Sequence, residues 1–76
     1  MTEEEQWNTF ETAVIAKLDQ LTCAQLRALY PVEATAAESA RMLQEALPDL
    51  AAGELVRQRA ATIVAGLIRV QLAERC

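Results

Sequence analysis

The longest apolar pattern in the chain covers Leu50 to Arg75 and predicts one helix of about 25 residues. At 100° per residue, the apolar side chains from Leu55 to Leu72 occupy an arc of roughly 220° around that helix. A helix on the surface of a small domain normally shows an apolar arc only somewhat wider than about 100°. We therefore expect more than one neighbour, from the same chain or from another, to cover this helix.

Two rows of side chains share this apolar arc. The row predicted to face the core of the chain consists of Val56, Ala60, Ile63, Leu67 and Val70. The second row, Val64, Ile68 and Leu72, is expected to face water, because the predicted second helix is too short to cover it. A contiguous exposed apolar row normally marks an interface, so these residues are predicted to bind a partner or a second copy. Thr62 and Gly66 form a notch of small residues where another backbone could approach.

Three capping boxes predict where the other helices begin, because in each a threonine precedes a glutamate or glutamine by three residues. The boxes are Thr2 with Glu5, Thr22 with Gln25, and Thr35 with Glu38. The first helix is predicted to run to about Gln20. The second stops before Pro31 and the third at Pro48, since a residue before proline is disfavoured in the α region. Asp49 is the expected N-cap of the last helix, although Gly53 could delay its start to Glu54.

The fold class that follows is all-α: a small four-helix bundle in a single domain over residues 1–76, with three short to medium helices and one long C-terminal helix. Hydrophobic residues make up 53% of the chain, and few glycines and prolines are left for turns, which is typical of helical domains. The predicted core is Trp7, Phe10, Val14, Leu18, Leu26, Leu29, Leu43, Leu47, Val56, Ile63 and Leu67. Trp7 has a second interpretation, because a tryptophan near a helix end can also be a partly exposed anchor for a partner.

Charge is uneven along the chain. The net charge is −4, and the first fifty residues are acidic whereas the last helix is basic. An acidic balance opposes the phosphate attraction on which DNA and RNA binding depends. We therefore expect no nucleic acid as a ligand.

Candidate chemistry is sparse. The chain has no histidine, the commonest general base and metal ligand, and its one serine, Ser39, has no base predicted beside it. We expect no catalytic residues, no metal and no cofactor, and we do not expect an enzyme. Cys23 is interpreted as a small buried residue or, at a helix N-terminus, a reactive thiol, and Cys76 as an exposed thiol. Two cysteines without a secretory signal predict a reducing, cytoplasmic location, and the longest uncharged run, Ala60 to Ile68, is too short to span a membrane.

The function predicted from the sequence is a small helical protein interaction module, such as an adaptor, co-chaperone or inhibitor. Its partner-binding residues would be Trp7, Val64, Ile68 and Leu72, and a homodimer is the expected assembly. An alternative comes from residues 22–43, which resemble a helix-turn-helix and would imply a nucleic-acid-binding regulator. The would-be recognition helix, however, offers Arg41 as its one basic residue, beside Glu38 and Glu45.

Overall fold

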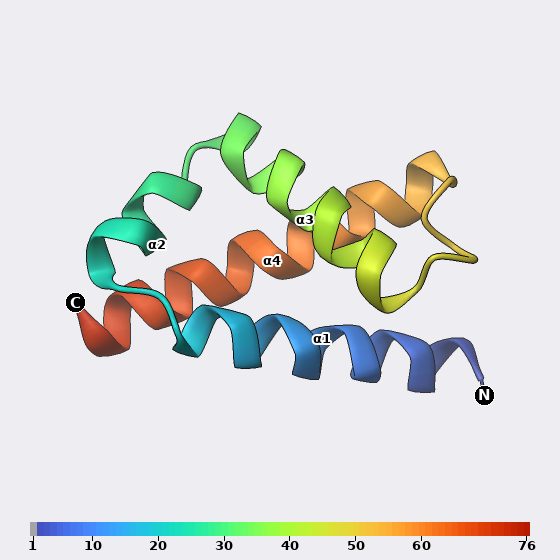
Figure 1. The fold of residues 1–76 in the computed structure, drawn as a ribbon, viewed down its shortest axis with the longest axis horizontal. Helices are drawn as coiled ribbons and strands as arrows, with labels where there is room; N and C mark the ends of the chain where they lie inside the picture. The colour runs from blue at the N-terminus through green and yellow to red at the C-terminus, as the bar shows by residue number, and fades with distance from the viewer. Residues whose placement is uncertain (1) are drawn as a thin grey trace.

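Four helices make up the regular structure of residues 2–76, the part of the chain that the computed structural model describes. They are α1 (Glu3–Asp19), α2 (Cys23–Leu29), α3 (Val32–Ala46) and α4 (Glu54–Arg75). These residues contain no β-strand, so the all-α prediction and the prediction of a long last helix are confirmed. In Figure 1, α1 and α4 lie side by side and run in the same direction, whereas α3 runs back over α4. The helix α4 contacts each of the other three helices.

Two of the predicted capping boxes start their helices as expected. The Thr2 hydroxyl accepts from the Glu5 amide at 3.2 Å, and the Thr2 amide donates to the Glu5 carboxylate at 3.3 Å. The same reciprocal pair joins Thr22 and Gln25, at 3.1 and 2.8 Å. Each box satisfies two amides that the first helical turn leaves without partners.

The third box, Thr35 with Glu38, is wrong. Helix α3 begins four residues earlier than this box predicts, with Pro31 as its N-cap and Val32 as its first helical residue. Thr35 is therefore buried one turn inside the helix, where its hydroxyl donates to the carbonyls of Leu29 and Tyr30. The threonine thus caps the end of α2, whose last carbonyls have no partners within their own helix.

The start of α4 agrees with the later of the two predicted positions. Gly53 is the N-cap and Glu54 the first helical residue, so Asp49 is not the N-cap. Between α3 and α4 the chain makes tight turns, in which the Leu50 amide donates to the Leu47 carbonyl and the Gly53 amide to the Leu50 carbonyl.

One apolar core lies between the four helices. Its buried members are Trp7, Phe10, Val14, Leu18, Leu26, Met42, Leu43, Leu47, Ala51, Ala60, Val64 and Ile68. The core predictions for α1, α2 and α3 are thus confirmed except at Leu29, which is only half-buried. The predictions for α4 are less accurate, since Val56, Ile63 and Leu67 are also only half-buried.

The orientation of α4 about its own axis differs from the prediction. Ala60, Val64 and Ile68 are 0% exposed, whereas Val70, expected in the core, is 50% exposed. At 100° per residue, the buried row lies about 80° around the helix from the predicted one. Helices α1, α2 and α3 together cover the wide apolar arc, so the predicted exposure of Val64 and Ile68 is wrong.

We predict that Ile68→Ala lowers the free energy of unfolding by about 2–5 kcal/mol, because it removes a fully buried side chain and leaves a cavity. The matched control is Leu55→Ala in the same helix, where the side chain is 80% exposed, and its expected effect is within about 0.5 kcal/mol. Urea unfolding of the disulfide-bonded protein measures both. Equal effects of the two substitutions would contradict the orientation of α4.

Candidate functional site

The residues predicted to bind a partner lie inside the chain or against its core. Trp7 is 4% exposed, Val64 and Ile68 are fully buried, and Leu72 is half-buried against the core. Val64, Ile68 and Leu72 therefore do not form the exposed apolar row that the sequence predicts, and Trp7 is not an exposed anchor. The physical reason is that both α2 and α3 pack against α4, so that together they bury the side of α4 that was expected to face water.

Trp7 fills the core, which was the other interpretation of this residue. Its ring meets Phe10 edge to face, with centroids 5.6 Å apart. The Arg59 guanidinium lies 4.5 Å from the centroid of the Trp7 ring, and Arg59 also pairs with Glu3 at 3.8 Å. The cation covers the indole on the solvent side, a contact worth about 0.5–1 kcal/mol at exposed sites. Trp7 is thus a packing residue, and Arg59 is already engaged within the chain.

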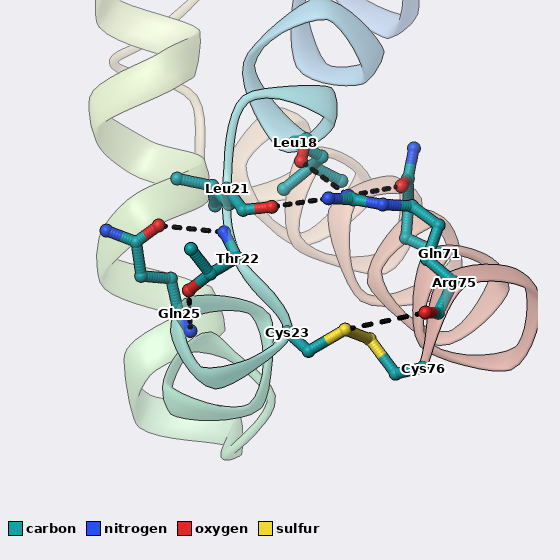
Figure 2. Close-up of a disulfide and its surroundings, with 8 residues drawn as sticks. All are labelled: Leu18, Leu21, Thr22, Cys23, Gln25, Gln71, Arg75 and Cys76. Carbon is teal, nitrogen blue, oxygen red and sulfur yellow. Dashed lines mark hydrogen bonds between the residues drawn. A yellow bond between two sulfur atoms is a disulfide. The ribbon is translucent and has the colours of Figure 1, made fainter.

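The cysteines form a disulfide, so both interpretations of Cys23 as a thiol and that of Cys76 as an exposed thiol are wrong. Figure 2 shows the bond, which joins the first residue of α2 to the residue after α4, with Cα atoms 5.9 Å apart. The two cysteines are 53 residues apart in the sequence, so the bond closes a long loop. Neither sulfur is therefore a nucleophile or a metal ligand in this state.

Arg75 makes a second connection between helices at the same end of the molecule as the disulfide (Figure 2). Its guanidinium donates to the carbonyls of Leu18 and Leu21, at the end of α1, and to the Gln71 side chain at 2.8 Å. Gln71 in turn donates to the Asp19 carboxylate at 2.6 Å. A cation at a helix C-terminus satisfies orphan carbonyls and opposes the negative end of the dipole. The C-terminal end of α4 is therefore held to both α1 and α2.

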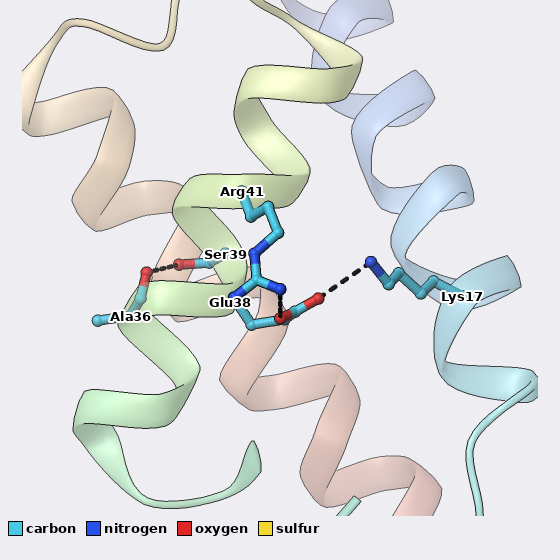
Figure 3. A network of polar contacts seen from close by, with 5 residues as sticks. All are labelled: Lys17, Ala36, Glu38, Ser39 and Arg41. Carbon is cyan, nitrogen blue, oxygen red and sulfur yellow. Dashed lines mark hydrogen bonds and ion pairs between the residues drawn. The ribbon is translucent and has the colours of Figure 1, made fainter. Parts of the chain in front are cut away.

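A polar cluster links α1 to α3 (Figure 3). The Glu38 carboxylate, whose side chain is 10% exposed, pairs with Lys17 at 3.1 Å and with Arg41 at 3.5 Å. Ser39 is buried beside it and donates to the Ala36 carbonyl. Every charge in this cluster has a partner, which is typical of a structural ion pair.

Two apolar grooves flank the outer face of α4. The first, which we call the α3–α4 groove, has a volume of about 450 Å³. It is lined by Tyr30, Pro31, Val32, Thr35, Ala36, Ala61, Thr62, Ala65 and Arg69. Tyr30 is 49% exposed and Val32 84% exposed, so the largest exposed apolar side chains of the α2–α3 connection lie at this groove.

The second groove, which we call the α1–α4 groove, has a volume of about 550 Å³. It is lined by Glu11, Thr62, Ile63, Gly66, Leu67, Arg69, Val70 and Ala73. Thr62 and Arg69 line both grooves. The predicted notch at Thr62 and Gly66 therefore lies at the border between them. A Cβ added to Gly66 would meet only the Arg69 guanidinium, at 4.0 Å, so the space above this glycine is open.

Glu11 and Arg69 are the charged residues of these grooves, and both are exposed. The ion pairs within residues 2–76 join Lys17 and Arg41 to Glu38, and Arg59 to Glu3. Neither Glu11 nor Arg69 takes part in one of these pairs. Both charges are therefore available to a molecule that enters a groove.

Tyr30, Val32 and Ala65 contribute much of the apolar lining of the α3–α4 groove, and none of them is among the partner-binding residues predicted from the sequence. The described residues hold no group of three or more metal-ligating side chains close enough to share an ion. None of the described helices combines the length and the apolar character needed to cross a membrane.

Comparison of the chain with protein-family models, with curated proteins and with solved structures found no match. The candidate function therefore rests on the two grooves and on the charges beside them.

The structure predicts that loss of the disulfide strongly destabilises the protein. In the chain-entropy model, a loop of this length contributes about 4 kcal/mol, a large part of the folding stability expected for a chain of this size. We expect the Cys23→Ser/Cys76→Ser double variant to lose roughly that amount in urea unfolding. Titration of thiols in the unreduced, unfolded wild type is the check on the bond itself, and two reactive thiols per chain would contradict it.

Proposed function

We propose that this chain is a four-helix bundle that acts as a protein interaction module, by binding and not by catalysis. The partner is a helix of another protein, and it binds in the α3–α4 groove. The observation that carries the proposal is an open apolar groove between two helices, with exposed Tyr30 and Val32 beside it and the unpaired Arg69 in its lining.

The shape and composition of the groove support a helical partner. Ala36 from α3 and Ala61 and Ala65 from α4 line it, and such short side chains allow another helix to approach closely. Amphipathic helices bind grooves of this kind through apolar side chains at positions i, i+3, i+4 and i+7. An acidic side chain on the bound helix would pair with Arg69, which gives the complex an orientation.

The helix-turn-helix alternative gains no support from α3. Arg41 is already paired with Glu38, and the remaining charged side chains of α3 are acidic. A nucleic-acid ligand would therefore meet a helix of unfavourable charge.

The cytoplasmic location stays a prediction. One of its premises, two unpaired cysteines, is wrong, and disulfides are rare in the cytosol. The α3–α4 groove contains neither cysteine, so the proposed binding needs the fold that the bond stabilises but not the sulfur atoms themselves.

A selection of displayed helical peptides tests the proposal, with Ala36→Glu as the variant that places a charge in the groove. Ala37→Glu is the matched control, because Ala37 is the next residue of α3, is exposed and does not line the groove. We expect selected peptides to share apolar i, i+3, i+4 spacing and an acidic residue. Titration should show at least about tenfold weaker binding to Ala36→Glu than to wild type or Ala37→Glu.

Two results would count against this function. One is a selection that enriches no helical peptide, and the other is a set of peptides that bind Ala36→Glu as tightly as wild type. Backbone amide shifts measured by NMR locate the bound peptide, and shifts confined to α1 would place the site elsewhere.

A further inference from the structure

The α1–α4 groove carries opposite charges on its two edges. Gln71 of α4 donates to Asp19 of α1, which shows the side of α4 on which α1 lies. Around the axis of α4, Gln71 lies about 140° from Gly66 on the side that faces α1. Arg69 lies about 60° from Gly66 on the side that faces away from α1. The groove therefore has an acidic edge at Glu11 on α1 and a basic edge at Arg69, with Gly66 between them.

Between these edges the surface is apolar. Val70 is 50% exposed, and Ile63 and Leu67 are half-buried. Ile15 is 38% exposed and lies one turn beyond Glu11, on the same side of α1. From Thr62 to Ala73 the groove follows α4 for about 16 Å.

We propose that a second copy of this chain binds in the α1–α4 groove, with the two α4 helices crossing near Gly66. In a two-fold pair, each contact between two different residues occurs twice. Glu11 of each copy then pairs with Arg69 of the other copy, and the exposed side chains of Val70 and Ile15 on each copy are covered by the other copy. Both charges, unpaired within the chain, gain partners in this arrangement.

A second copy fits this groove better than an unrelated protein because the groove is complementary to itself. An unrelated partner would need a basic and an acidic group at the matching positions, whereas a copy already carries them. The open space above Gly66 lets two helices approach closely at the crossing.

This inference rests on the proposed function, because it also takes the outer face of α4 as an interaction surface, but it concerns the other groove. Sedimentation equilibrium of the disulfide-bonded protein measures it. We expect wild type to dimerise and Val70→Glu to dissociate about 100-fold more readily, because the dimer would then bury an unpaired carboxylate of each copy among apolar side chains. Leu55→Glu is the control, since Leu55 is an exposed apolar residue of the same helix outside the groove.

Charge reversal tests the pairing directly. Glu11→Arg alone and Arg69→Glu alone should each weaken the dimer about tenfold. The double variant should restore wild-type affinity, because the same pairs form with reversed signs. All these residues are exposed in the single chain, so circular dichroism should show unchanged helicity.

A wild type that stays monomeric at millimolar concentration would overturn the inference. So would a dimer that tolerates Val70→Glu, or a double variant no tighter than the single ones. Failure of this inference can be distinguished from failure of the proposed function by peptide binding. Val70 does not line the α3–α4 groove, so the Val70→Glu variant should still bind the selected helical peptides.

Discussion

The structure depends on the burial of one row of α4 by the other three helices. Ala60, Val64 and Ile68 are completely removed from solvent, and α4 is the element against which α1, α2 and α3 all pack. A chain of 76 residues buries a limited apolar surface. Because α4 is central, the apolar faces of the other three helices can all be buried against it. The disulfide and Arg75 hold the C-terminal end of α4 in place.

The outer face of α4 is defined by the same burial. Because Val64 faces inward, Thr62, Gly66 and Arg69 face outward, and the spaces to either side become the α3–α4 groove and the α1–α4 groove. Arg69 lines both grooves. An acidic helix in one groove and a second copy in the other would therefore compete for the same guanidinium, so that partner binding and self-association are coupled.

Local signals in the sequence predicted much of the fold. The boxes at Thr2 and Thr22 start their helices as predicted, because capping chemistry involves residues only three apart. The box at Thr35 failed because Pro31 offered an earlier helix start, and the threonine hydroxyl then found carbonyls of α2. The disulfide was not predictable, since residues 53 apart in sequence can be near or distant in space.

The site was predicted less well than the fold, and the reason lies in the width of the apolar arc of α4. The apolar side chains of α4 span roughly 220°, which is wider than the face that one neighbouring helix covers. The apolar residues alone therefore do not show which of them lies at the centre of the buried face. The narrower polar arc, centred near Thr62 and Gly66, would have placed that centre opposite, at Val64. The burial of Val64 and Ile68 in α4 is tested most directly by NMR, as the relaxation of methyl groups caused by a paramagnetic agent dissolved in the solvent, measured on dilute protein. The account predicts strong relaxation at Leu55 and Val70 and little at Val64 and Ile68, and the reverse order would contradict it.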